Sequence, residues 1–169
     1  MSMSVDSLKN NLTNPARVYL WDIIIPSPKG GGDGNSLELR CQSTMIPGRS
    51  VGEIKVPYKG TPGIKFPGKA TMSQKWTATF VEGLDKKIFA ALTGWAQATI
   101  NARTGIGLPD VMLKSDIYLW CLKSDGKPWL KIKLVGCYVE SVEDVPLTYD
   151  TEAIVVFNTT FSYDYWEEV

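Results

Sequence analysis

Residues 74–82 read QKWTATFVE, and this stretch decides the fold because it fixes a strand and the element after it. Apolar and polar side chains alternate along it, which is the period of a strand with one buried face. The apolar face carries Trp76, Ala78 and Phe80, and the polar face carries Lys75, Thr77 and Thr79. Residues 85–103 then change to a helical period, with Asp85 expected in the first turn. We therefore expect a half-buried strand followed by the one long helix of the chain.

A second alternating stretch lies at the C-terminal end of the sequence. Residues 152–166 predict one long strand, whose apolar face includes Val155, Phe157, Phe161 and Tyr163. Its other face is polar and carries Asn158, Thr160, Ser162 and Asp164. Two strands of the same amphipathic kind favour a sheet with one face on the core and one face open.

The rest of the chain adds further strands. Strand composition occurs at 17–25, 36–42, 52–58, 116–123 and 128–135, and 137–142 continues the last of these. Asp125-Gly126 predicts a tight hairpin, and the PSPKGGGDGN run at 26–35 predicts a flexible loop that joins 17–25 and 36–42 as another hairpin. We predict one mainly β domain over residues 1–169, a β-barrel or β-sandwich of about seven strands with one α-helix.

The amino-acid composition argues against several classes of function. The 169 residues are 44% hydrophobic and 21% charged, with 18 Lys and Arg against 18 Asp and Glu. This balance argues against a dedicated nucleic-acid binder, because phosphate contacts require a surplus of basic side chains. Histidine is absent from the sequence, which excludes Ser-His-Asp and Cys-His catalysis and zinc sites with a histidine ligand.

The cysteines and the apolar runs bear on the compartment. Cys41, Cys121 and Cys137 lack Cys-x-x-Cys spacing, so we interpret them as reduced, buried side chains of a protein assembled in a reducing cytoplasm. Residues 1–12 contain no apolar stretch, and no run of about 18 apolar residues occurs in the sequence. We expect no secretory signal and no membrane insertion.

Residues 59–73 are rich in Gly, Pro and Lys, and we predict that they form a structureless loop ordered by a partner. Gly63 to Lys69 has the GxxxxGK spacing of a phosphate-binding loop, but Ala70 stands where a magnesium-binding hydroxyl is needed and Pro67 removes a backbone donor. The acidic clusters at 140–144 and 164–168 are interpreted as solvated strand ends rather than as catalytic carboxylate pairs. We therefore predict no enzymatic activity, no cofactor and no metal site.

Four short sequence motifs, taken in their order along the chain, carry a resemblance to a known protein family. They are NPARVYLWDI at 14–23, CQSTMIPG at 41–48, WTAT at 76–79 and DYWEE at 164–168. Together they resemble the tail tube proteins of contractile-tailed bacteriophages, whose fold is akin to that of Hcp, the ring-forming protein of type VI secretion. The resemblance covers nearly the whole chain and departs from the family in the Gly-rich segment 29–34 and the proline-containing segment 62–67.

This resemblance implies a structural virion protein that forms hexameric rings, stacked into the inner tail tube through which DNA passes into the host cell. Each subunit would lend about four strands to an inner barrel of about 24 strands, leaving roughly 40 Å open at ~4.8 Å strand spacing and ~45° tilt. The protein would be assembled in the bacterial host cytoplasm. Its implied partners are further copies of itself, the tail sheath protein, which would meet the helix, the baseplate and tail terminator proteins, and DNA that passes without sequence-specific binding.

Two sets of site residues follow from this implied tube. The lumen wall would be mostly uncharged or mildly acidic, with Thr77, Thr79, Asn158, Thr160 and Ser162 as candidate lining residues. Residues 59–73 would make the principal ring-to-ring contact, through Ile64, Lys65, Phe66 and Lys69.

Two other readings stay open at this stage. One is the tube initiator protein on the baseplate, which shares the fold. The other, from a different class, is a monomeric ligand-binding β-barrel module that uses some of the six tryptophans and seven tyrosines as a stacking platform.

Overall fold

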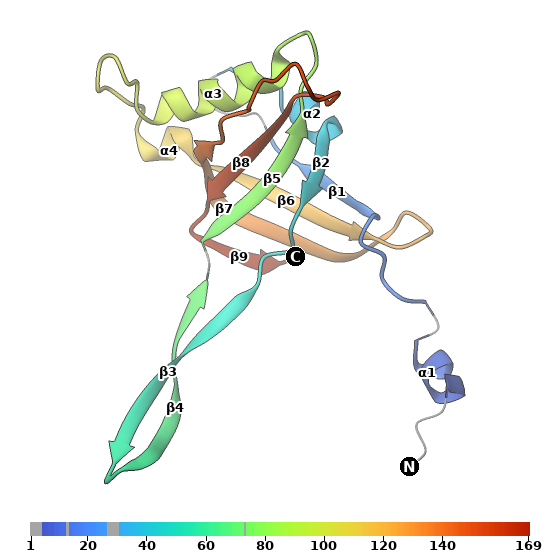
Figure 1. Ribbon diagram of the computed structural model, residues 1–169, viewed down its shortest axis with the longest axis vertical. Helices are drawn as coiled ribbons and strands as arrows, with labels where there is room; N and C mark the ends of the chain where they lie inside the picture. Colours follow the sequence, from blue (N-terminus) through green and yellow to red (C-terminus); the bar gives the residue numbers. More distant parts are fainter. Residues whose placement is uncertain (1–4, 13, 27–30, 73) are drawn as a thin grey trace.

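The computed structural model describes residues 5–12, 14–26, 31–72 and 74–169, and its body is an antiparallel sheet of seven strands (Figure 1). The strand order is β1-β6-β7-β8-β5-β2, and β9 also pairs with β7. The strands are β1 (Trp21–Ile24), β2 (Cys41–Thr44), β5 (Lys75–Val81), β6 (Ser115–Leu122), β7 (Pro128–Val142), β8 (Val156–Ser162) and β9 (Tyr165–Glu168). Residues of β1 and β2 line one shared groove, although these edge strands do not pair within the described part of the chain. The sheet is therefore curled but not closed.

Strand β7 links the two halves of this sheet. Its first part pairs with β6 and β9, and its last part pairs with β8, so one strand belongs to both halves. The predicted Asp125-Gly126 hairpin between β6 and β7 is confirmed, because Gly126 has a φ of 78° and Lys123 N donates to Lys127 O at 2.8 Å. The segments predicted at 128–135 and 137–142 form this single strand.

Helix α3 (Lys87–Thr99) packs on the core side of the sheet and corresponds to the predicted long helix. Trp95 on α3 lies 5.8 Å from the ring of Phe161, which also contacts Trp76 at 5.4 Å. The helix begins two residues later than expected, and its N-terminus is capped by Glu82, whose carboxylate accepts the N–H groups of Ile88 and Phe89 at 3.3 and 2.6 Å. Asp85 instead lies before the helix.

The strand predicted at 36–42 is wrong over most of its length. Residues Gly34–Leu39 form helix α2, whose N-cap Asp33 accepts hydrogen bonds from Asn35 N and Ser36 Oγ. The Asp33 carboxylate stabilises the start of a helix, and this effect outweighs the strand preference of a short alternation of apolar residues. The hairpin predicted between 17–25 and 36–42 is wrong as well, because β1 pairs with β6 and β2 pairs with β5. Residues 27–30 of the predicted loop at 26–35 lie outside the described residues.

The predicted long final strand is divided into β8 and β9. Both run antiparallel along β7, and the break falls at Tyr163 and Asp164. Tyr163 is buried in the core, while the Asp164 carboxylate pairs with Lys114 at 2.8 Å. Only β8 goes on to pair with β5, so the break lets one chain segment serve both halves of the sheet.

Four helices and a two-stranded hairpin lie outside the main sheet in the described part of the chain. The described residues contain more helix than the single one predicted, namely α2, α4 (Asp110–Leu113) and α1 (Val5–Asn11) in addition to α3. Strands β3 (Arg49–Tyr58) and β4 (Thr61–Met72) form a separate two-stranded sheet that projects from the body (Figure 1). Helix α1 stands apart from the body on another side, and none of its residues is buried.

Candidate assembly surfaces

The polar face of β2, β5, β8 and the end of β7 contains all five candidate lining residues. In the register of β5 and β8, Thr77 lies opposite Thr160, Thr79 lies opposite Asn158, and Ser162 lies opposite Lys75. The other faces of both strands point to the core, where Trp76, Phe80 and Phe161 are buried. The five residues therefore form one continuous surface, which we call the Thr/Asn face.

Hydrogen bonds connect neighbouring strands across the Thr/Asn face. Thr79 Oγ1 donates to Asn158 Oδ1 at 3.1 Å, and Asn158 Nδ2 donates to Glu143 Oε2 at 3.0 Å. Lys75 Nζ pairs with Glu140 Oε1 at 2.6 Å. With one lysine and two glutamates, the charged residues of these contacts sum to −1. The sequence interpretation assigned both glutamates to a solvated strand end and did not connect them to this face, because the pairing of β7 with β8 brings them there.

The β3–β4 hairpin corrects the prediction for residues 59–73. Thr61–Met72 form a strand rather than a structureless loop, and Ser73 lies outside the described residues. The Gly63 to Lys69 motif therefore lies within an extended strand, which does not offer the curved backbone of a phosphate-binding loop. Pro and Gly are tolerated here because the hairpin has two free edges, where no ladder donor is required.

The hairpin places apolar side chains on one face. In the strand register Ile54 lies opposite Phe66 and Val56 lies opposite Ile64. Lys55 and Lys65 are also opposite each other in the register, with their side chains on the other face. The four apolar side chains keep 47–61% of their surface exposed, so the hairpin does not cover them itself. We call Ile54, Val56, Ile64 and Phe66 the apolar stripe.

Of the four predicted ring-contact residues, only Ile64 and Phe66 belong to the apolar stripe. Lys65 lies on the other face, where its Nζ pairs with Glu53 at 3.0 Å, and Lys69 is exposed further toward the base. Ile54 and Val56 were missed as members of the same surface. Apolar and charged residues alternate along 53–56, and this pattern could have identified Ile54 and Val56 if the pairing of 53–56 with 64–67 had been known.

Helix α1 provides a second exposed apolar surface. Val5 and Leu8 on α1 and Leu12 directly after it recur at helical spacing and are 69%, 63% and 56% exposed. A helix of 7 residues is too short to be stable in water without packing. The N-terminal segment and the hairpin therefore both present surfaces that a folded monomer leaves uncovered.

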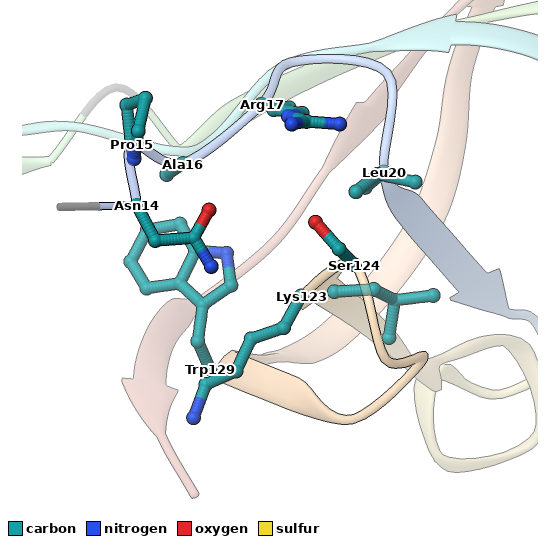
Figure 2. A pocket seen from close by; sticks show the side chains of 9 residues that line it. Asn14, Pro15, Ala16, Arg17, Leu20, Lys123, Ser124 and Trp129 are labelled. Atoms are coloured by element: carbon teal, nitrogen blue, oxygen red, sulfur yellow. The ribbon is translucent and has the colours of Figure 1, made fainter.

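The described residues also form surface pockets, which bear on the ligand-binding reading. Figure 2 shows one between the N-terminal segment and the β6–β7 turn, with Asn14 and Pro15 on one side and Ser124 and Trp129 on the other. Its volume is about 220 Å³, and the apolar groove between β1 and β2 measures about 270 Å³. Two further pockets are larger, about 380 Å³ beside Lys114 and Asp164 and about 460 Å³ at the end of α3 around Ile100. Because the usual ligand pocket measures roughly 300–1,000 Å³, pocket volume alone does not decide against a ligand.

Chemically reactive groups are sparse in the described part of the chain. It holds no cluster of three or more His, Cys, Asp or Glu side chains placed to bind a metal ion. All three cysteines are free, and burial raises the pKa of the Cys41 and Cys137 thiols to about 12. Among these residues no helix is both long and apolar enough to span a membrane.

Several solved structures share this fold. The chain resembles one in the anti-feeding prophage baseplate, with a TM-score of 0.67, 9% identity and coverage of 92% of this chain and 95% of that one. It resembles one in the anti-feeding prophage tube-terminating cap, with a TM-score of 0.64, 16% identity and coverage of 92% and 91%. For the PVC sheath–tube complex of an extracellular contractile injection system, the TM-score is 0.61 at 16% identity, with 99% of both chains covered. These low identities show a common fold and nothing finer.

Sequence comparison goes further than the fold. No curated protein sequence matches the chain. The sequence profile of the family described as phage tail tube protein matches residues 18–169, which include the whole sheet, the hairpin and α3. The resemblance found in the sequence motifs is thereby confirmed, and the chain belongs to the phage tail tube protein family.

Proposed function

We propose that this protein is the tube subunit of a contractile tail, and that it forms hexameric rings which stack into a conduit for DNA. Family membership supports the tube role. The apolar stripe of the β3–β4 hairpin is the observation that carries the proposal. Its four side chains are exposed in the monomer, and a second copy of the chain stacked on the hairpin would cover them.

The hairpin suits a contact made through its face. A two-stranded hairpin is marginally stable by itself in water, so a partner that covers the apolar stripe also stabilises the hairpin. Covering the exposed part of each side chain contributes on the order of 1 kcal/mol before ordering costs, and six copies in a ring act together. Pro57, Pro62 and Pro67 lie along its strands and cannot donate to an added strand, which disfavours pairing through the edges.

The Thr/Asn face suits the lumen of the tube. The four strands β2, β5, β8 and β7 form this half of the sheet, and six subunits would supply about 24 strands to a barrel about 50 Å across at the backbone. A wall of Thr, Ser and Asn with a small negative charge gives phosphates no cationic site at which to stop. In this arrangement α3 lies on the far side of the core, where it would meet the sheath.

The test is assembly by a variant with a polar stripe. We expect the double variant Ile64→Ser, Phe66→Ser to form folded rings that do not elongate, as judged by light scattering and negative-stain images. The matched control is Lys55→Ser, Lys65→Ser, which changes the opposite face of the same two strands and should still give tubes.

The other outcomes separate the alternatives. Tubes of normal length from the stripe variant would show that the hairpin does not stack the rings. A wild-type protein that stops at single rings would identify a tube initiator. A wild-type protein that stays monomeric at every concentration would favour the ligand-binding module.

A further inference from the structure

The residues at the base of the hairpin, at the start of β3 and after β4, both contact the C-terminal segment. On the β3 side, Trp166 Nε1 donates to Gly48 O at 3.3 Å, and the Arg49 guanidinium lies 4.2 Å above the Trp166 ring. Arg49 Nη2 also donates to Trp166 O at 3.5 Å. On the β4 side, Gln74 Nε2 donates to Asp164 O at 3.3 Å, and Gln74 O accepts from Tyr163 N at 3.0 Å.

These contacts fix the hairpin to the body of the molecule. Within the described residues β3 and β4 pair only with each other, so the sheet itself does not hold the hairpin at a set angle. Trp166 does belong to the sheet, since it pairs with Leu134 of β7. Asp164 is held in turn by Lys114 Nζ, which lies 2.8 and 2.9 Å from its two carboxylate oxygens.

We propose that Trp166 and Arg49 are positioning residues that set the angle between the β3–β4 hairpin and the body. The value of that angle for assembly rests on the proposed ring-to-ring role, whereas the angle itself does not. A strand of 12 residues at ~3.3 Å per residue reaches about 40 Å, so a swing of about 15° at the base moves the tip by about 10 Å. That displacement exceeds the spacing of two strands and would take the apolar stripe away from a site on the next ring.

The angle can be measured directly with a pair of spin labels. Lys59→Cys places one at the hairpin turn, and Gln97→Cys places the other on the exposed side of α3, with labelled subunits diluted in unlabelled protein. Burial raises the pKa values of all three native thiols, so reagents at neutral pH react with the two introduced cysteines. Double electron–electron resonance then reports the distribution of distances between turn and helix.

The informative variants leave the fold in place. Arg49→Gln removes the cation without touching β9, and Trp166→Phe keeps a ring while removing the Nε1 donor. We expect each to broaden the distance distribution at least twofold and to slow tube elongation several-fold at an unchanged melting temperature. Arg49→Lys, which keeps a cation over the ring, should restore part of the narrow distribution. The control is Arg103→Gln, an equal charge change in an exposed turn away from the hairpin.

One result would overturn the proposal, and a second would overturn its link to assembly. A distribution as narrow as wild type in both Arg49→Gln and Trp166→Phe would show that these contacts do not set the angle. A broadened distribution with normal elongation would show that the angle has no part in assembly. Failure of the ring-to-ring role would be seen separately, as elongation by the Ile64→Ser, Phe66→Ser variant, and would not change the label distances.

Discussion

Arg40 joins two parts of the chain that lie far apart in sequence. Its guanidinium, just after α2, donates to both carboxylate oxygens of Asp85 at 2.7 and 2.6 Å. It also lies 3.7 Å from Glu82, the residue that caps α3. The hydrogen bond from Arg40 holds the pKa of Asp85 at about 2, below its ordinary value of 3.8. One side chain therefore connects α2, the end of β5 and the start of α3.

The Arg40–Asp85 pair predicts a pH dependence of stability. A lowered pKa in the folded state stabilises the protein above pH 3.8, and this contribution is lost as the pH falls through about 2. We expect Arg40→Gln to melt below wild type at pH 7, with a difference that shrinks between pH 4 and pH 2. Thermal melts across this range check it, with Arg103→Gln as the control. A difference that stays constant down to pH 2 would contradict the assignment.

Gly136 predicts a second effect at the same scale. It lies in β7 with a φ of 69°, and an added Cβ would stand 2.3 Å from the Asp164 carboxylate. Gly136→Ala should cost about 1–3 kcal/mol in urea unfolding, because the backbone is strained and Asp164 must move. The control is Gly126→Ala, which has a φ of 78° but open space around the new methyl group. Equal losses in the two variants would show that the Asp164 contact contributes nothing.

At the scale of elements, the structure separates what local pattern can predict from what it cannot. The strand at 74–82 and the hairpin around Asp125-Gly126 follow from side-chain alternation and turn chemistry, and both formed as predicted. The five polar residues of the Thr/Asn face were predicted for the same reason, since period two fixes a face. The ion pair between Lys75 and Glu140 on the same face could not be predicted, because it depends on β5 and β7 both pairing with β8, which local sequence does not show.

Two of the wrong predictions, those for residues 36–42 and 59–73, have different physical causes. Residues 36–42 alternate over too few positions to outweigh the cap made by Asp33. Residues 59–73 read as loop because Gly and Pro disfavour strands in the interior of a sheet, a rule that does not apply to a projecting hairpin. Residues 61–72 form a strand because they pair with β3, and the composition of residues 59–73 does not show this pairing.

The hairpin can be removed as a unit, which gives the third prediction. Val51 and Ala70 are direct partners, so replacing residues 52–69 with Asn-Gly would close a two-residue turn between them. We expect a folded body with near wild-type circular dichroism that forms rings and no tubes. Deleting residues 61–68 alone is a poorer test, since it would leave β3 without its partner. Tubes of normal length from the shortened protein would contradict the stacking role.

At the scale of the whole molecule, two halves of one sheet present different surfaces. The half formed by β1, β6, β7 and β9 carries Trp120 with Lys131 and Tyr118 with Lys133 as neighbouring aromatic and basic side chains. The Thr/Asn face on the other half carries mostly Thr, Ser and Asn, and the charged residues of its contacts sum to −1. Under the proposed function, this small negative charge suits the wall of a channel in which a polyanion must slide.

The fourth prediction tests that wall by reversing its charge. Thr77 and Thr160 are cross-strand partners, and Thr77→Lys with Thr160→Lys would add about 12 positive charges to each ring of the proposed hexamer. Tubes of this variant should retain duplex DNA in co-sedimentation, with retention that falls as salt rises. The control is Gln97→Lys on α3, which should leave retention at the wild-type level. Equal retention by both would show that the Thr/Asn face does not line the channel.

In the proposed role the tube would be driven through a cell envelope under mechanical load, and β7 would determine how one subunit bears that load. A pull along the axis of β7 must break its backbone hydrogen bonds to β6, β8 and β9 together, which is loading in shear. A pull on β1 or β2 opens bonds to a single neighbour one after another, as in unzipping. Rupture of an isolated subunit would therefore begin at strands with a single neighbour, which in the described part of the chain include β9 as well as β1 and β2. Neighbouring subunits that pair with β1 and β2 in a closed ring would remove two of these starting points.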